Sequence, residues 1–182
     1  MGAIATQGTN PVAFTLPAEY RPDHTVYVAV DMCGASNGRL EIQSNGVVTV
    51  QAETSFSNAQ CFTSLDGASF VAASDLYTPL TLSNGWVGAP FSTVNPGTLV
   101  LGSDTIAFAG AVRTSGTNPV AFTLPASLAP GHNVYIPVDM CGATNGRLNI
   151  SPSGVATIQA ETSFSDAACF TSLDGATYTI WH

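Results

Sequence analysis

The four cysteines are the residues of this 182-residue chain whose type and spacing point most directly to chemistry. They form two pairs, Cys33 with Cys61 and Cys141 with Cys169, and both pairs have the same 28-residue separation. The spacing of zinc ligands is missing, because there is no Cys-x-x-Cys motif and two of the three histidines lie beside prolines in turn-like positions. We expect either one disulfide in each pair or two pairs of reduced thiols. A disulfide would contribute about 3–4 kcal/mol and would form only outside a reducing cytosol.

Side chains that could act in catalysis do not form a recognisable set. Ser64 and Asp66 lie close together in "CFTSLDG", but a serine nucleophile needs a neighbouring base, and the chain has 3 histidines. There is no G-x-S-x-G elbow, no H-E-x-x-H and no glycine-rich phosphate loop. Glu53 and Asp66 could converge for sugar hydrolysis, but a turn at Asp66-Gly67 explains this aspartate more simply. We therefore expect no enzyme activity, no catalytic residues, no metal and no cofactor.

Trp86 and Tyr77 are the candidates for binding a ligand. They stand among Asn, Asp and Ser residues in a loop-rich stretch that also contains Phe91. An aromatic ring can stack on a sugar while polar neighbours bind the sugar hydroxyls. The alternative, which we favour, is that Trp86 fills the end of a β-sandwich or a contact between subunits.

An internal repeat organises all of these residues. When the chain is shifted by 108 residues, positions 2–70 align with positions 110–178 without a gap, and 48 of the 69 pairs are identical. We expect two homologous domains, at 1–72 and 73–182. Residues 71–109 lead into the second copy and have no equivalent before the first. The first domain is therefore expected to be truncated at its N-terminus, unless a neighbouring molecule supplies the leading strands.

Both copies have the sequence pattern of strands and turns. In "NVYIPVDM", Val134, Ile136 and Val138 alternate with other residues, as one face of a half-buried strand requires. Asn45-Gly46 in the first copy and the "PSG" at 152–154 in the second each predict a β-hairpin. No stretch has a helical period. We expect an all-β fold in which each copy is a β-sandwich or a jelly-roll-like barrel.

Asp31 and Arg39 of the first copy recur as Asp139 and Arg147 of the second. Only 9% of the residues are charged, so a recurring carboxylate and guanidinium on adjacent strands suggest structural ion pairs that fix the strand register. The alternative is that these residues agree only because the duplication is recent.

The charge of the chain excludes several classes of partner. Its net charge is -8, and its four basic residues are all arginine. Nucleic acids and anionic membranes are bound by clustered cations, so we expect neither as a partner. No apolar run approaches the roughly 18 residues needed to span a bilayer, which excludes membrane insertion by a helix. The N-terminal residues lack the features of a secretory signal, and we expect a soluble chain.

The order of several short motifs resembles the repeat domain of phage tail fibres and receptor-binding proteins. "FTLPAEYRP" at 14–22 resembles the LP-x-x-RP segment of that family, "GRLEI" and "GRLNI" resemble its central strand, and "SLDGASF" and "SLDGATY" resemble its closing strand. The second copy departs from the first motif, because Ala129 stands in place of the arginine. The motifs cover most of the chain but mark turns and strands, so they carry no site residues with them.

This resemblance implies a β-barrel or jelly-roll-like unit, commonly a homotrimer, on a virion tail that is made in the host cytoplasm. Such proteins often bind a cell-surface saccharide during host attachment. Sparse charge agrees with self-association, because a largely neutral surface is usually covered by neighbours. The alternatives are a free carbohydrate-binding module or lectin, and a purely structural fibre spacer without a ligand.

Overall fold

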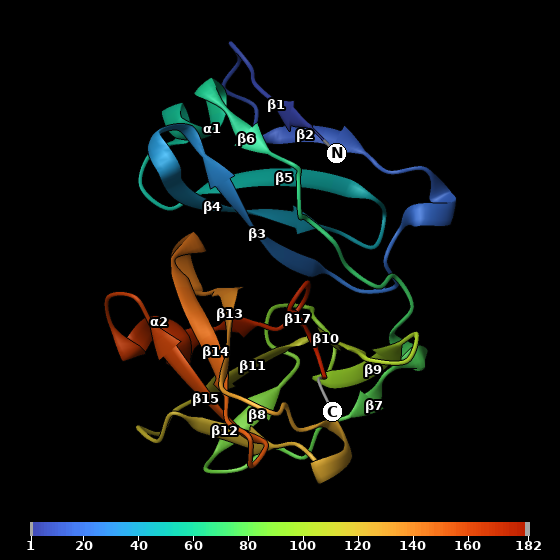
Figure 1. Cartoon of the computed structure of the whole chain (residues 1–182). Helices are drawn as coiled ribbons and strands as arrows, with labels where there is room; N and C mark the ends of the chain where they lie inside the picture. The colour runs from blue at the N-terminus through green and yellow to red at the C-terminus, as the bar shows by residue number, and fades with distance from the viewer. Residues whose placement is uncertain (1, 181–182) are drawn as a thin grey trace.

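The chain folds into two β-rich units that stack on each other (Figure 1). The computed structural model describes residues 2–180, so Met1, Trp181 and His182, at the ends of the two expected domains, lie outside the described residues. Each unit has its own hydrophobic core, one formed from residues 4–70 and one from residues 80–180. The strands are antiparallel, and each of the two α-helices has 6 residues. The expected all-β fold is confirmed.

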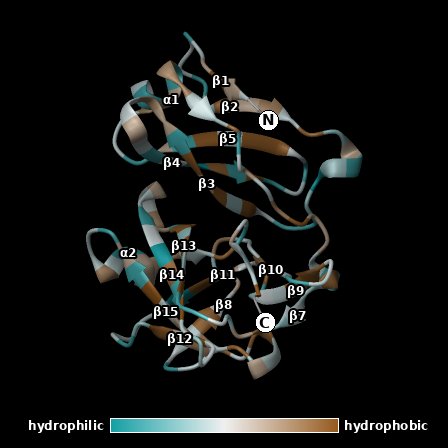
Figure 2. Cartoon of the chain, in the orientation of Figure 1, coloured by the Kyte–Doolittle hydropathy of each residue, from teal (hydrophilic) through white to brown (hydrophobic). Residues whose placement is uncertain are grey.

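The first unit is built on one six-stranded sheet in the order β1-β6-β3-β4-β5-β2. Alternate residues of the β3–β4–β5 meander, such as Val28, Leu40 and Val50, point into its core, as the period of a half-buried strand requires. Figure 2 shows the hydrophobic stretch along β5. The elements of this unit are β1 (Ala3–Ile4), β2 (Val12–Thr15), β3 (Val26–Met32), β4 (Ser36–Ile42), β5 (Val47–Ala52), α1 (Phe56–Cys61) and β6 (Thr63–Ser64).

The second unit repeats this framework and adds strands in front of it. Its sheets have the orders β17-β10-β9-β7, β16-β11-β8 and β12-β15-β14-β13. Phe108, Phe122 and Tyr178 lie in its core. The elements are β7 (Thr78–Pro79), β8 (Trp86–Gly88), β9 (Gly97–Leu101), β10 (Thr105–Ala109), β11 (Ala111–Thr114), β12 (Val120–Thr123), β13 (Val134–Asp139), β14 (Asn145–Ile150), β15 (Val155–Ala160), α2 (Phe164–Cys169), β16 (Thr171–Ser172) and β17 (Thr177–Thr179).

The two predicted hairpins are present, and a glycine makes each turn possible. Gly46 and Gly154 have φ angles of 87° and 80°, a region that residues with a Cβ rarely adopt. Each turn closes with a 2.8 Å hydrogen bond from the glycine N–H, to the carbonyl oxygen of Gln43 in one unit and of Ser151 in the other. These turns set the registers of β4 with β5 and of β14 with β15.

A disulfide fastens the short helix of each unit to the sheet. Cys33 is bonded to Cys61 and Cys141 to Cys169, with Cα–Cα distances of 5.7 and 5.8 Å. In both units the first cysteine follows a long strand and the second ends the helix. A six-residue helix is too short to be stable alone, so this bond and its packing against the sheet hold it in place.

Removing either disulfide is expected to lower the free energy of unfolding. Closure of a 28-residue loop restricts the unfolded chain, and we expect Cys141→Ser with Cys169→Ser to cost about 3–4 kcal/mol. Denaturant unfolding of the oxidised double variant against the unaltered chain measures this. A change below about 1 kcal/mol would mean that the loop closure contributes little to stability.

Candidate functional site

The contact between the two units is the most elaborate polar site of the molecule. β3 and β4 of the first unit lie against β13, β16 and the 3-10 helix Cys141–Ala143 of the second. Figure 1 shows β3 above β13 at this boundary. At its centre, Arg39 Nη1 donates hydrogen bonds to Asp139 Oδ2 at 3.0 Å and to the carbonyl oxygen of Met140 at 3.2 Å. The Asp139 side chain is completely buried. Sequence-distant residues thus form one ion pair that joins the units.

This pairing corrects the expectation that each unit would hold its own ion pair. In the register of β3 with β4, Asp31 lies opposite Asn37, whereas Arg39 lies opposite Ala29. Arg39 therefore reaches out of its own unit to Asp139, and Asp31 is exposed on the surface. Arg147 makes no ion pair with a carboxylate among the described residues.

Arg39 is held in place by its own unit before it reaches the other. Its Nε donates to Gln51 Oε1 at 2.7 Å, and its guanidinium lies 4.7 Å from the centre of the Tyr27 ring. Both contacts fix the plane of the guanidinium and leave Nη1 free for a partner. The preorganised arginine loses little side-chain entropy when Asp139 binds it.

Aromatic packing and backbone hydrogen bonds surround the ion pair. The Tyr27 ring packs edge-on against Phe170, with ring centroids 5.1 Å apart. Ser172 Oγ donates to the Tyr27 carbonyl oxygen at 2.7 Å, and the Tyr27 N–H donates to Asp174 Oδ2 at 3.4 Å. The Asp139 carboxylate is completely buried among these contacts, so its attraction to Arg39 is screened less than it would be in water.

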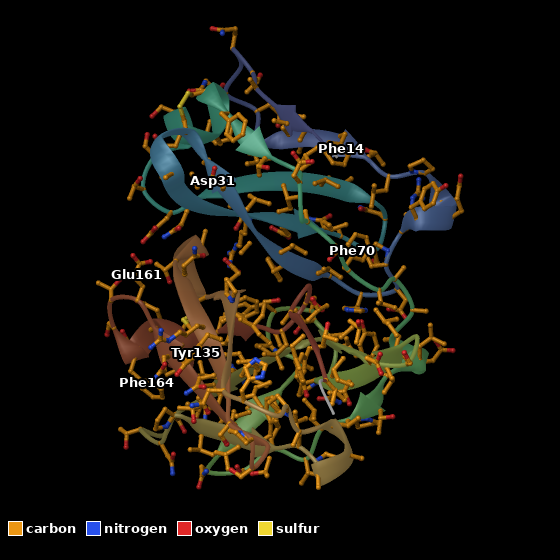
Figure 3. The ribbon with its side chains drawn as sticks, in the orientation of Figure 1. Phe14, Asp31, Phe70, Tyr135, Glu161 and Phe164 are labelled. Atoms are coloured by element: carbon orange, nitrogen blue, oxygen red, sulfur yellow. A yellow bond between two sulfur atoms is a disulfide. The ribbon has the colours of Figure 1, made fainter. Side chains whose placement is uncertain are left out.

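A chain of amides and carboxylates closes one side of the contact. Asn145 Nδ2 donates to Asn37 Oδ1 at 2.7 Å, and Asn37 Nδ2 donates to Glu53 at 3.0 Å and Glu161 at 3.1 Å. Figure 3 labels Glu161 at the boundary between the units. Asn37 and Asn145 are equivalent residues of the repeat, so here the two copies touch through the same position.

Two groups at this contact bind a proton more tightly in the folded chain. Burial raises the pKa of Asp139 to about 7, and Arg39 offsets only part of this effect. Burial acts to lower the pKa of His24, but hydrogen bonds and charges from Asp174 and Asp23 raise it overall. Asp139 Oδ1 is buried without a hydrogen-bond partner among residues 2–180. Protonation of either group therefore favours the folded chain.

The free energy of unfolding of the chain is accordingly expected to fall as the pH rises. The Asp139 contribution falls between the unfolded pKa of 3.8 and the folded value of about 7, by at most about 1.4 kcal/mol per pH unit. The His24 contribution is full below 6.5 and is lost as the pH passes its raised pKa. Denaturant unfolding at a series of pH values, with Asp139→Asn as the reference, measures the first part. A difference between the two proteins that does not change with pH would contradict it.

Because the units are repeats, each one carries the equivalents of both groups of residues that form this contact. We call Tyr27 and Arg39 the Arg side of the first unit, and their equivalents Tyr135 and Arg147 the Arg side of the second. The second copy is preorganised in the same way, with the Arg147 guanidinium 4.9 Å from the Tyr135 ring and a 2.7 Å hydrogen bond to Gln159. Tyr135 is 54% exposed, however, whereas Tyr27 is 9% exposed.

The first unit presents the complementary half. We call Asp139, Phe170 and Ser172 the Asp side of the second unit, and Asp31, Phe62 and Ser64 are their equivalents in the first. Phe62 is 38% exposed, whereas Phe170 is 2% exposed. Figure 3 labels Asp31 and Tyr135, one from each uncovered half. The molecule thus exposes one unused Asp side and one unused Arg side.

The two expected sugar-stacking residues, Trp86 and Tyr77, differ in how far they are buried. Trp86 is 4% exposed, and its Nε1–H donates to the Asn118 carbonyl oxygen at 2.9 Å. This placement agrees with the alternative that Trp86 fills an end of the β structure. The Tyr77 hydroxyl is buried without a hydrogen-bond partner among residues 2–180, and burial raises its pKa. Trp86 therefore offers no free face to a sugar, whereas Tyr77 is half-buried and lines a hollow of about 110 Å³ together with Phe70 and Leu101.

Phe91 has the exposed aromatic surface that Trp86 lacks. It stands above a hollow of about 150 Å³ whose lining includes Tyr27, Arg39 and Phe170. Phe91 has a φ of 53° and its neighbours Ala89 and Ser92 also have positive φ, so this loop is held in a strained conformation. Composition drew attention to the stretch around Phe91, but the hollow depends on a contact between units that the sequence does not reveal.

Two further findings concern metal ligands and apolar helices. Within residues 2–180, no three His, Cys, Asp or Glu side chains come together as a metal site would require. In the same part of the chain, no helix combines the length and the apolar character needed to cross a membrane.

Comparisons with known proteins give one similarity. No protein-family model matches the chain, and no curated protein matches it. Among solved structures, it is similar to the receptor binding protein (gp15) of Listeria phage PSA, with 22% sequence identity and a TM-score of 0.46. The similarity covers 58% of this chain and 65% of that one, which is less than two thirds of the phage protein.

Proposed function

We propose that this chain is a non-enzymatic component of a phage tail, part of a tail fibre or receptor-binding protein, which assembles as a homotrimer and binds a host cell-surface saccharide. The resemblance of "FTLPAEYRP", "GRLEI" and "SLDGASF" to the repeat domain of such proteins supports the family. In this reading the chain is made in the host cytoplasm and works on the virion, and its disulfides form after release.

The observation that carries the proposal is the position of the two contact halves on one unit. In the register of β13 with β14, Asp139 lies opposite Asn145 and Pro137 lies opposite Arg147. Asp139 and Arg147 are therefore close neighbours on the same face of this hairpin. Because the Arg side and the Asp side lie on one face of each unit, successive units that use this contact are rotated about a common axis. Such rotation allows the assembly to close into a ring. A fibre that grows in a line would need the halves on opposite faces.

An unpaired amide supports a further unit at the same axis. Asn145 donates to Asn37, but its own Oδ1 is buried without a hydrogen-bond partner among the described residues. A unit of a neighbouring chain that repeats the arrangement would place its own asparagine beside this oxygen. Because each chain already uses one Arg side and one Asp side internally, Arg147 of one neighbouring chain would reach Asp31, and Asp31 of another neighbouring chain would accept Arg147. Three chains would thus close a ring of six units.

Light scattering on the purified chain tests the assembly. The unaltered chain is expected to be a discrete oligomer, and Arg147→Asp is expected to weaken it by about 2–5 kcal/mol per contact because two carboxylates then face each other. Arg147→Asp with Asp31→Arg exchanges the charges and should restore the oligomer. Arg113→Asp, at an exposed arginine outside both halves, is the matched control. A monomeric unaltered chain, or an Arg147→Asp oligomer of unchanged stability, would refute the proposal.

We assign the saccharide to the hollow beneath Phe91. Phe91 supplies an exposed ring for stacking, and Arg39 supplies N–H donors for hydroxyl groups. A glycan array identifies ligands, and Phe91→Ala is expected to abolish their binding while the oligomer remains. The same affinity in Phe91→Ala and the unaltered chain would exclude this hollow.

A fibre spacer without a ligand is the second candidate, favoured by the burial of Trp86 in the core of the second unit. If the oligomer is stable and no glycan on the array binds, the spacer function is supported. A free carbohydrate-binding module or lectin predicts the reverse, namely glycan binding by a monomer.

A further inference from the structure

The Asp side of the second unit is built from two segments that are far apart in the sequence. One segment ends β13 with Asp139, and the next residue, Met140, provides the carbonyl oxygen that accepts a hydrogen bond from Arg39. The other segment, 170–172, follows α2, and its phenylalanine ring lies 5.7 Å from the Arg39 guanidinium. Arg39 therefore contacts both segments at once, and the contact requires them to be fixed relative to each other.

A disulfide joins the two segments directly beside these contacts. Cys141 follows Met140 and Cys169 precedes Phe170, and the two cysteines are bonded, with Cα atoms 5.8 Å apart. Among the described residues, the strand pairing between the segments is one isolated bridge, Met140 with Thr171. The disulfide is therefore the covalent link that fixes the two segments to each other.

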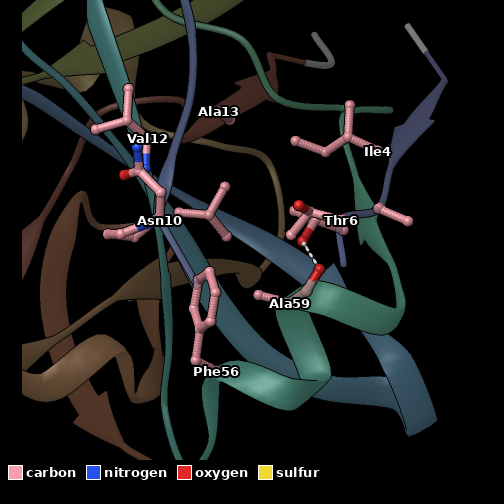
Figure 4. A pocket seen from close by; sticks show the side chains of 11 residues that line it. Ile4, Thr6, Asn10, Val12, Ala13, Phe56 and Ala59 are labelled. Carbon is pink, nitrogen blue, oxygen red and sulfur yellow. Dashed lines mark hydrogen bonds between the residues drawn. The ribbon is translucent and has the colours of Figure 1, made fainter. Parts of the chain in front are cut away.

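The second segment is attached to its helix rather than to β13. Thr171 Oγ1 donates a hydrogen bond to the Ala167 carbonyl oxygen of α2 at 3.0 Å. The equivalent hydrogen bond of the first unit, from Thr63 Oγ1 to the Ala59 carbonyl oxygen of α1, is the dashed line in Figure 4. A six-residue helix is too short to be stable alone, so without the disulfide the helix and the segment after it are free to leave β13.

The Arg side does not depend on a disulfide in this way. Tyr27, Arg39 and Gln51 lie on β3, β4 and β5, which are neighbouring strands of one sheet. Arg39 lies directly opposite Gln51 in the register of β4 with β5. Strand pairing holds these residues, so reduction of the cysteines leaves the Arg side in place.

Both disulfides can be reached by a small thiol. Cys61 and Cys169, which end α1 and α2, are exposed. A thiolate of a dithiol reductant attacks the Sγ atom of Cys169, which forms a mixed disulfide and releases the Cys141 sulfur as a thiolate that takes up a proton. The second thiol of the reductant then displaces the Cys169 thiol. The protein gains two electrons and two protons, and the reductant becomes a disulfide.

We propose that the disulfide of each unit is a redox switch for its Asp side. In the oxidised unit the Asp side is assembled and binds an Arg side, and in the reduced unit its two segments separate while the Arg side remains. For Cys141–Cys169 the switched contact is the one between the two units of the chain. For Cys33–Cys61, which joins the segments of Asp31 and Phe62, it is the contact between chains and so rests on the proposed function.

Amide hydrogen exchange tests the switch within the chain. The Tyr27 N–H donates to Asp174 Oδ2 across the contact, so its exchange rate reports whether the units touch. Cys141→Ser with Cys169→Ser is expected to raise this rate at least about 10-fold, because the released segments open locally. Dithiothreitol added to the unaltered chain should have the same effect, and reoxidation should reverse it.

Two comparisons separate the switch from general unfolding. The Ile158 N–H, which donates to the Pro119 carbonyl oxygen inside the second unit, should keep its slow exchange in that variant. Cys33→Ser with Cys61→Ser removes the equivalent disulfide of the first unit and should leave the Tyr27 rate nearly unchanged. The proposal is overturned if the Tyr27 rate does not rise, if it rises equally in both variants, or if Ile158 loses its protection to the same extent. In the last case the disulfide would hold the whole unit rather than the Asp side.

Light scattering tests the switch between chains. If the unaltered chain is an oligomer, as the proposed function requires, Cys33→Ser with Cys61→Ser is expected to lower its mass to that of a single chain. An unchanged mass would overturn the switch at the contact between chains. A monomeric unaltered chain would instead refute the proposed assembly, and the exchange of Tyr27 would still decide whether the switch acts within the chain.

Discussion

Arg39→Ala is expected to destabilise the chain by about 3–5 kcal/mol at pH 8, because it leaves the buried carboxylate of Asp139 without its partner. Arg147 occupies the same position of the other copy and has the same glutamine and tyrosine contacts, but it is exposed. Arg147→Ala is therefore expected to change the stability of the chain by no more than about 0.5 kcal/mol. The difference in unfolding free energy between the two variants therefore measures the ion pair with Asp139, because the glutamine and tyrosine contacts are lost in both.

The pH dependence adds a second test of the same prediction. Asp139 has a pKa raised to about 7, so at pH 5 it is largely protonated and needs its cationic partner less. The cost of Arg39→Ala should therefore be smaller at pH 5 than at pH 8. Denaturant unfolding is measured at low protein concentration, where self-association does not contribute. Equal costs for Arg39→Ala and Arg147→Ala would show that the ion pair does not join the units.

The strands and hairpins could be predicted because they depend on neighbours in the sequence. The alternation in "NVYIPVDM" and the turn at Asn45-Gly46 both report local geometry, and each appears in the structure as expected. The duplication likewise follows from comparing the chain with itself. Such features need no knowledge of how distant segments meet.

The partners of the charged residues could not be predicted, because they depend on strand register and on how the units pack. Arg39 and Arg147 are identical in type and in local sequence, yet one is joined to a buried aspartate and the other is exposed. Asp31 and Arg39 lie on adjacent strands, but the register places each opposite another residue. A shift of a strand pairing by two residues would have kept every hydrophobic position and changed every ion pair.

The candidate binding residues show the same limit. Composition singled out the stretch that contains Trp86 and Phe91 but did not reveal which ring is exposed. Trp86 follows a turn and enters β8, so its side chain goes to the core, while Phe91 lies in a loop with positive φ. The backbone conformation of a few residues therefore decides which of the two aromatic rings is exposed.

Phe170→Ala is expected to cost about 3–5 kcal/mol of unfolding free energy, and Phe62→Ala no more than about 1 kcal/mol. The two phenylalanines are equivalent residues that follow equivalent helices, but only Phe170 is packed between Tyr27 and Phe91, with ring centroids 5.1 and 5.6 Å away. Its removal leaves a cavity at the centre of the contact between the units.

The second measurement for this pair is the oligomer. Phe62 belongs to the uncovered Asp side, where the proposed assembly would bury it as Phe170 is buried within the chain. Phe62→Ala should therefore leave the chain folded but weaken the oligomer seen by light scattering. Phe170→Ala should instead lower the free energy of unfolding of the single chain. If Phe62→Ala left the oligomer unchanged, the assembly would have to use a surface other than the Asp side. If Phe170→Ala cost no more than Phe62→Ala, the contact between the units would not contribute to folding.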